Sequence, residues 1–346
     1  MPVDGEIQIT FDRYLLPASI TRQSVFVVDA NGQPIDPVIT RYDPVSRTVF
    51  VSGSNATWIT AGQPYKLRFA IPPNDTVDDR GLRAIDRATL DPNQPLEVAF
   101  FASAATGEKN EKTLDFCGDI LPIFALRCTS GVCHGGSAPP SGAAAGLVLD
   151  SFTGLQKTAI RRIANSANTG GHSGDPPAPG SIFGIDMPII DPGRPDNSWL
   201  LYKIEMAREP SVDAGSVPRL ICNQRPNEDT LAQRTENPFR FLVNIQQADD
   251  FERGVLNDFV PGREMPYPPA FVSSPVEQAL SFEERERIRI WIGQGAKITE
   301  CGGCTDFRVA ASDAGADATT DAAPSGEDAG DAGTDASDAS TDAQDQ

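Results

Sequence analysis

The stretch "LRCTSGVCHGG", residues 126–136, decides how the second half of the chain is interpreted. It holds two cysteines and a histidine, Cys128, Cys133 and His134, in close succession. The two thiols at this spacing can close a disulfide ring. Together with the imidazole they can instead bind a metal ion or carry a covalently attached cofactor. The residues on either side of the stretch bear on the choice among these three possibilities.

The order of the three side chains follows the C-x-x-C-H signature, in which two thiols attach a c-type haem and the histidine binds its iron. Four residues separate the cysteines here instead of two. The longer loop has slack, so both thiols can still reach the vinyl carbons of the macrocycle. A second iron ligand is often a methionine sulfur from far along the chain. Met265, in the proline-rich loop "VPGREMPYPP", is the candidate, because a polar loop is a poor place for a core methionine.

The order of segments over roughly residues 115–298 resembles the cytochrome c-like domains of large bacterial surface proteins, such as the planctomycete-type cytochromes. The resemblance is carried by "CHGG", "AAGLVLDSFTGL", "IIDPGRPDNSWLLYKI", "MPYPP" and "LSFEERERIRIWIGQGA", in that order. It implies a covalent haem c attached at Cys128 and Cys133, with His134 and Met265 as the axial ligands of the iron. It also implies one-electron transfer, since two axial ligands leave no open position for a substrate.

Residues 1–104 predict an all-β sandwich. Short alternating segments are separated by turns rich in glycine, proline and asparagine, namely "EIQITF", "SVFVVDANGQPI", "RTVFVSG", "PYKLRFAI" and "LEVAFFAS". The region resembles bacterial Ig-like domains of surface-layer and cell-wall proteins, through "IQITFDRYLLPASITRQSVFV" and "ITAGQPYKLRFAIPPNDTVDDRGLRA". Its Asp75, Asp78 and Asp79 either cap turns or bind calcium.

Residues 105–305 predict a mostly α domain with long loops. Helices are expected within residues 114–128, 151–164, 197–207 and 280–296. Pro122 suits the first turn of the first helix, where its missing N–H does little harm. In the last helix Ser281 and Glu284 form a capping box, and Gly295 marks the end. The apolar face of that helix consists of Ile288, Trp291 and Ile292.

The charge distribution separates a tail from the rest of the chain. The formal net charge is −19, and the tail at residues 309–346 contributes ten acidic residues and no basic one. Residues 306–346, rich in aspartate and alanine, predict a disordered tail, because they offer too little apolar surface to offset the entropy of ordering. The acidic remainder argues against nucleic acid as a partner. No apolar run is long enough for a transmembrane segment.

Four more cysteines, Cys117, Cys222, Cys301 and Cys304, are candidates for two disulfides. The pair in "CGGC" follows the last helix, so one of the two is expected to join Cys117 at the start of the first helix. Disulfides indicate an oxidising compartment. The first residues lack the features of a signal peptide. We therefore expect a periplasmic or cell-surface protein whose signal sequence is not in this chain; reduced thiols in the cytoplasm are the alternative.

Several alternatives stay open at the site. Cys128 and Cys133 can close a disulfide ring, or can bind zinc with His134 and one cysteine of "CGGC". His172 or Met187 can replace Met265 on the iron. Trp291 and Tyr267 can contact the edge of a haem, or they can simply fill the core. Arg263 can pair with a haem propionate, or it can be an ordinary exposed arginine of the loop.

These features together predict a multidomain protein, in which an Ig-like spacer precedes a monohaem domain whose partner is a redox protein or a component of the cell envelope. No catalytic Ser/His/Asp set and no pair of catalytic carboxylates stands out in the sequence. The sequence therefore favours an electron carrier over an enzyme. The alternative function is a haem-free, disulfide-stabilised surface protein with a structural or adhesive role. A third possibility is a partner domain of an oxidase or peroxidase with an open iron position.

Overall fold

The structure, a computed structural model, describes the following residues: 1–36, 38–55, 57–71, 81–107, 113–129, 133–136, 142–165, 167, 183–207, 250–267 and 279–302. By its contacts the chain divides into two units, Met1–Phe307 and Arg308–Gln346. The second unit, with nearly all of the predicted tail, lies outside the described residues. The predicted boundary near residue 104 stays a prediction.

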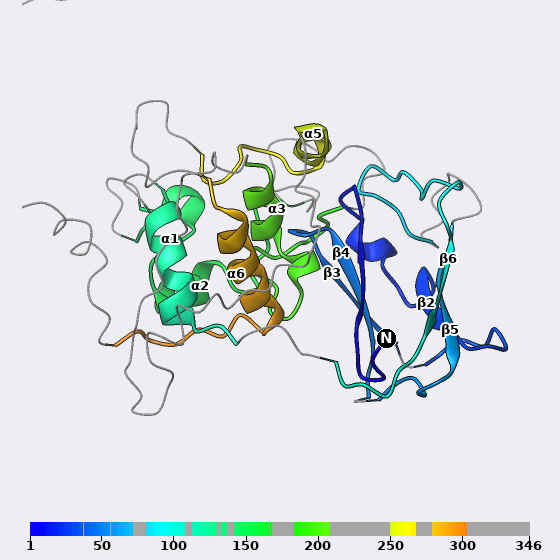
Figure 1. Cartoon of the computed structure of the whole chain (residues 1–346). Helices are drawn as coiled ribbons and strands as arrows, with labels where there is room; N and C mark the ends of the chain where they lie inside the picture. The colour runs from blue at the N-terminus through cyan, green and yellow to red at the C-terminus, as the bar shows by residue number, and fades with distance from the viewer. Residues whose placement is uncertain are drawn as a thin grey trace, which may run out of the picture. The chain divides into compact units, whose positions relative to one another are not determined.

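Two antiparallel sheets form a β-sandwich at the N-terminal end, as the alternating sequence pattern predicts (Figure 1). The first sheet has the order β1-β4-β3 and the second the order β2-β5-β6. The strands are β1 (Ile7–Thr10), β2 (Val25–Val28), β3 (Val38–Asp43), β4 (Thr48–Gly53), β5 (Pro64–Phe69) and β6 (Glu97–Phe101). Five of them lie in the predicted segments; β3 was not predicted, because "VITRYD" mixes polar and apolar residues without a clean alternation.

The sandwich core lies between the inward faces of both sheets. Val25 and Val27 from β2, Val49 and Val51 from β4, and Leu67 from β5 are all buried in one cluster. In β1 the pairings Ile7 with Val51 and Ile9 with Val49 place both isoleucines against this cluster. Side chains alternate along a strand, so β5 buries Tyr65 and Leu67 and exposes Pro64 and Lys66, whereas β4 is buried on both faces from Thr48 to Val51.

Short helices dominate the described residues after the sandwich (Figure 1). They are the π-helical turn η2 (Phe116–Ile120), α1 (Leu121–Arg127), the 3-10 turn η3 (Ala144–Gly146), α2 (Phe152–Thr158), the 3-10 turn η4 (Pro195–Asn197), α3 (Trp199–Glu205), α5 (Asp250–Phe259) and α6 (Phe282–Gly293). Pro122 lies in the first turn of α1, as predicted. Helix α2 is shorter than predicted, because the chain beyond it makes bridges at Ile160 and Ile163 to Ile190 and Pro188. Helix α5 was not predicted.

Helix α6 begins and ends where the sequence predicts. The Ser281 hydroxyl accepts from the Glu284 N–H and the Glu284 carboxylate accepts from the Ser281 N–H, so the capping box is complete. Gly295, just past the end of the helix, has a φ of 97°, a conformation that favours glycine. The predicted apolar face is buried in the same cluster as α1.

Charged side chains of α6 are buried as well, which the sequence pattern does not predict. Arg285 pairs with Glu205 of α3 at 3.4 Å, and Arg289 pairs with Asp43 of β3 at 3.3 Å. Glu205 also accepts a hydrogen bond from the Tyr14 hydroxyl at 3.1 Å. Buried charges are tolerated only when they are paired and hydrogen-bonded. These pairs therefore join α6 to the sandwich through residues far apart in the sequence.

Glu286 of α6 lies in this buried charge network. One of its oxygens accepts from Arg289 at 2.8 Å, and the Asp43 carboxylate lies close enough to act on its pKa. Burial raises the pKa of Glu286, the Arg289 guanidinium lowers it and the Asp43 carboxylate raises it, with a net rise. Glu286 is thus held in its neutral form around neutral pH.

The raised pKa predicts a pH-dependent stability. Between the ordinary glutamate pKa and the raised one, the folded protein holds a proton that the unfolded chain has lost. The free energy of unfolding should therefore fall as the pH rises through this window. Glu286→Gln stays neutral at every pH, so it should be more stable than wild type by about 1–3 kcal/mol above the window, since one pKa unit corresponds to about 1.4 kcal/mol.

Urea unfolding of wild type, Glu286→Gln and the exposed control Glu300→Gln at a series of pH values checks this prediction. The stability gain of Glu286→Gln should grow with pH, whereas that of the control should not. A gain for Glu286→Gln that does not depend on pH would show that the residue is ionised in the folded protein.

Candidate functional site

Helix α1 leads directly into the motif with two cysteines and a histidine. It follows the turn η2, where the Asp115 carboxylate accepts from the Gly118 N–H at 2.7 Å. Helix α1 ends at Arg127, and the Cys128 N–H donates to the Phe124 carbonyl at 2.8 Å. The helix thus places Cys128 at its C-terminal end, beside the core cluster of α1 and α6.

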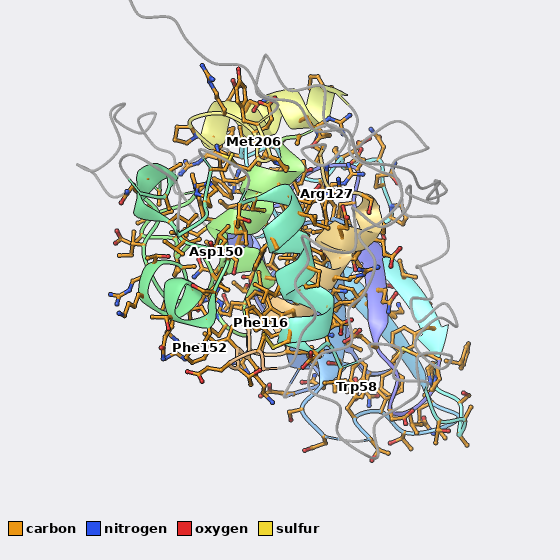
Figure 2. All side chains as sticks on the ribbon, turned by 90° about the vertical axis from the view of Figure 1, so that its left-hand side faces the viewer. Trp58, Phe116, Arg127, Asp150, Phe152 and Met206 are labelled. Atoms are coloured by element: carbon orange, nitrogen blue, oxygen red, sulfur yellow. A yellow bond between two sulfur atoms is a disulfide. The ribbon has the colours of Figure 1, made fainter. Side chains whose placement is uncertain are left out.

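A buried ion pair fixes the end of α1 against the start of α6. The Arg127 guanidinium donates twice to one oxygen of Glu284, at 3.1 and 3.3 Å. The other oxygen of Glu284 belongs to the capping box with Ser281. Arg127 and Glu284 are both buried, so one carboxylate holds two helix ends together at the residue before Cys128. Figure 2 shows Arg127 on this helix and Asp150 in the neighbouring segment.

His134 is held by backbone hydrogen bonds on both sides. Its N–H donates to the Cys128 carbonyl at 2.9 Å, and its carbonyl accepts from the Leu149 N–H at 2.8 Å. The Ala144 N–H donates to the Cys133 carbonyl at 2.8 Å. The segment 144–149, which contains the predicted "GLVL" motif, therefore lies along the cysteine-histidine motif and fixes its backbone.

The imidazole of His134 is oriented by the same segment. Its Nδ1 lies 3.2 Å from the Ala144 carbonyl oxygen. Because a carbonyl can only accept, Nδ1 carries the proton and Nε2 keeps its lone pair. Burial lowers the pKa of His134, while backbone hydrogen bonds at Leu147 and Ala144 raise it, with a net decrease. A neutral imidazole whose Nδ1 is bonded to a backbone carbonyl is the form that binds a metal through Nε2.

Both glycines after His134 have a structural reason. A Cβ on Gly135 would lie 2.9 Å from the Thr129 carbonyl oxygen, which leaves no room for a side chain. The Gly136 N–H donates to the Asp150 carboxylate at 2.7 Å. Asp150 was not singled out in the sequence, because its partner is a backbone N–H that no motif describes. It closes the loop around His134.

Cys128 and Cys133 are thiols in the structure and are not joined in the small ring that the sequence left open. Desolvation raises the pKa of the Cys128 thiol to about 12, with further rises from Cys133 and Glu284 and a lowering by Arg127. Cys128 is therefore a neutral thiol at neutral pH.

The zinc alternative has no further support among the described residues. Cys301 is occupied in a disulfide, and Cys304 lies outside the described residues. In the part of the chain that the structure describes, no group of three or more His, Cys, Asp and Glu side chains could hold a metal ion. A c-type haem does not require such a group, because a histidine and a methionine are often the protein ligands of its iron.

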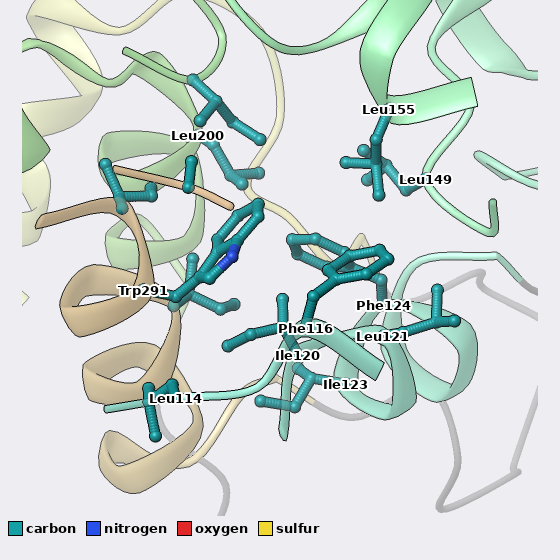
Figure 3. Close-up of a cluster of buried hydrophobic side chains, with 14 of the residues drawn as sticks. Leu114, Phe116, Ile120, Leu121, Ile123, Phe124, Leu149, Leu155, Leu200 and Trp291 are labelled. Atoms are coloured by element: carbon teal, nitrogen blue, oxygen red, sulfur yellow. The ribbon is translucent and has the colours of Figure 1, made fainter. Parts of the chain in front are cut away.

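Met265 packs against the same hydrophobic cluster as Cys128. Its side chain is partly buried, and its N–H donates to the Lys203 carbonyl at 3.0 Å. Figure 3 shows the centre of this cluster, where Trp291 from α6 faces Phe116 and Phe124. The ring centroids of Trp291 lie 6.0 Å from those of both phenylalanines. Cys128 and Met265, 137 positions apart in the sequence, thus border one apolar cluster.

The other candidates for the site lie elsewhere. Met187 is buried in a second cluster, which includes Trp199 and Tyr202. The Arg263 guanidinium lies over the Tyr267 ring, 4.3 Å from its centroid. His172, the three aspartates at residues 75–79 and Cys222 lie outside the described residues. Of the two methionines considered as ligands, Met265 borders the cluster that Cys128 also borders, whereas Met187 does not.

One predicted disulfide is present. Cys117 in the turn η2 is bonded to Cys301 after α6, with the two Cα atoms 5.6 Å apart. The sequence left three pairings of the four cysteines open, and this bond agrees with the expected link from Cys117 to the "CGGC" pair. It ties the two ends of the helical region together across 184 positions.

Removing this disulfide should destabilise the protein. Cys117→Ser is expected to lower the free energy of unfolding by about 2–4 kcal/mol, because a long loop gains entropy in the unfolded chain. Urea unfolding without reductant measures the loss, and Cys301→Ser should show the same loss. If the two variants unfold at the wild-type urea concentration, the bond does not contribute to stability.

A cavity of about 190 Å³ lies between the sandwich and the helical residues. Its lining includes Arg41, Asp43, Arg194 and Arg289, and none of Cys128, Cys133, His134 and Met265. These arginines are paired with carboxylates, namely Arg41 with Glu6, Arg194 with Asp196 and Arg289 with Asp43. The cavity therefore belongs to the seam between the two regions and not to the candidate site.

No protein-family model, curated protein or solved structure matches this chain. The resemblances to Ig-like and cytochrome c-like domains therefore rest on the sequence motifs. Of the helices in the described residues, none is long and apolar enough to cross a membrane.

Proposed function

We propose that the protein is an extracytoplasmic monohaem c-type cytochrome that carries single electrons. The observation that carries the proposal is the orientation of His134. Its Nδ1 is bonded to the Ala144 carbonyl, and Cys128, a neutral thiol, and Met265 border the adjoining apolar cluster. This donor set fits a c-type haem better than it fits a zinc ion or a catalytic histidine.

Each residue has one role in this proposal. Cys128 and Cys133 would hold the macrocycle through thioether links, and His134 and Met265 would bind its iron. When bound, haem supplies the one-electron couple of its iron. The chain's own contributions are to orient the imidazole through Ala144 and to border the site with the apolar cluster. An iron held by both His134 and Met265 would have no position for a substrate, so transfer to a redox partner is the proposed activity.

The β-sandwich has a positioning role in the same proposal. The ion pair between Arg289 and Asp43 and the hydrogen bond between Tyr14 and Glu205 join it to α6 and α3. Helix α6 also carries Trp291 in the cluster beside the site. An Ig-like sandwich attached in this way would hold the haem region toward a redox partner or a component of the cell envelope.

The second candidate function is a haem-free surface protein with a structural or adhesive role. It is favoured by the disulfide Cys117–Cys301 and by the packing of Trp291 against Phe116 and Phe124, which together stabilise the helical region. In that case His134 would be a structural residue that only joins two loops.

Absorption spectroscopy separates the two functions. The protein purified from a host that attaches haem c should be red and low-spin in both oxidation states, and it should bind carbon monoxide slowly because both axial positions are filled. A colourless protein would support the haem-free function. A red protein that binds carbon monoxide rapidly would indicate an open iron position and an oxidase or peroxidase partner role.

A further inference from the structure

The loop that carries Met265 is attached to one residue of α3 at two points. The Met265 N–H donates to the Lys203 carbonyl at 3.0 Å. The Lys203 ammonium donates to the Pro261 carbonyl at 3.2 Å. Lys203 thus contacts both ends of the segment 261–265, one end through its backbone and the other through its side chain.

The backbone contact uses a carbonyl that the helix leaves without a partner. The last four carbonyls of an α-helix cannot accept from the helix itself. Lys203 lies in the last turn of α3, which ends at Glu205. The N–H of Met265 therefore satisfies a helix-end carbonyl, and this bond fixes the backbone of the proposed ligand.

The side-chain contact is unusual because it buries a lysine. The Lys203 residue is only 8% exposed, although lysines are almost never buried without a partner. Its ammonium lies beneath the loop, since a Cβ added to Gly262 would be 3.5 Å from Nζ. Glu264, in the same loop, adds an attractive charge. A buried ammonium aimed at a backbone carbonyl restrains that carbonyl more than an exposed side chain would.

We infer that Lys203 is a positioning residue for the Met265 loop, which it clamps at Pro261 and at Met265 so that the methionine stays against the apolar cluster that Cys128 also borders. This inference rests on the proposed function where it concerns iron binding. The clamp itself concerns only the chain and can be tested without haem.

The first test measures hydrogen exchange of the Met265 amide in the haem-free full chain. Lys203→Met keeps most of the apolar stem and removes the ammonium. Exchange at Met265 should accelerate by about tenfold, because the loop loses one of its two attachments, while amides in the core of α6 should be unaffected. Lys157→Met, a change of an exposed lysine on α2, is the matched control and should leave Met265 unchanged. Unchanged exchange in Lys203→Met would overturn the clamp.

The second test uses the haem-loaded protein and separates positioning from simple packing. Lys203→Met should lower the low-spin fraction and shift the midpoint potential, whereas Lys203→Arg, which can still donate to Pro261, should restore both toward wild type. A wild-type spectrum and potential in Lys203→Met would overturn the positioning role even if exchange is faster. If no haem attaches to the wild-type chain, the proposed function fails, and the exchange experiment still decides the clamp.

Discussion

Replacing Glu284 with alanine is expected to lower the free energy of unfolding by about 3–5 kcal/mol, because the change leaves the buried Arg127 charge without its carboxylate. Glu284 is fully buried, and its two oxygens serve different partners. One accepts from Arg127 and the other from the Ser281 N–H. The variant therefore loses an ion pair and half of a capping box together. Urea unfolding of the haem-free chain measures the loss.

Two further variants separate the contributions of Glu284. Ser281→Ala removes only the hydroxyl cap and should cost about 1 kcal/mol. The double variant Arg127→Met with Glu284→Met should cost less than the sum of the two single changes, because neither charge is then left alone. Additive losses would show that Arg127 and Glu284 act independently. Since Arg127 precedes Cys128, Glu284→Ala should also reduce the yield of haem-loaded protein.

Replacing Met265 with alanine is expected to change the electronic state of the haem-loaded protein. Without the methionine sulfur the iron should lose its low-spin spectrum, and the midpoint potential should fall by on the order of 100 mV, within the range of about 0.8 V that axial ligands span. Haem should remain attached, because the thioether links and His134 are unaffected. Absorption spectra and a redox titration measure both effects.

Met187→Leu is the matched control for this experiment. Met187 is buried in the second cluster, so a change of similar volume should leave the spectrum and the potential unchanged. If Met265→Ala keeps a wild-type spectrum, Met265 does not bind the iron. A changed spectrum in Met187→Leu or in His172→Ala would then identify the actual ligand.

Local sequence patterns predict the elements whose formation depends on neighbouring residues. Alternation identifies five strands of the sandwich, and the pair Ser281 and Glu284 identifies the start of α6 because a capping box is a local device. Strand β3 and helix α5 are not identified in this way. The polar residues of β3 face partners that tertiary structure supplies, such as Asp43 with Arg289, and no local pattern shows that a charge is buried.

The sequence predicts those candidate site residues that would act through their side chains. The thiols, the imidazole and the thioether identify Cys128, Cys133, His134 and Met265 from their types and order. Ala144 contacts His134 through its backbone carbonyl, and Asp150 accepts from the backbone N–H of Gly136. Contacts with backbone atoms do not require a particular residue type, so the sequence does not reveal them. The Cys117–Cys301 pairing was one of three that the sequence allowed, because only the packing of η2 against the end of α6 brings those two sulfurs together.

The most direct measurement is the intact mass of the unfolded chain after production in a host that matures c-type cytochromes. Covalent haem attachment at Cys128 and Cys133 should give a mass increase of one haem per chain that survives denaturation and is absent from the Cys128→Ser, Cys133→Ser double variant. A wild-type chain of unmodified mass, with Cys128 and Cys133 both open to alkylation or joined to each other, would contradict it.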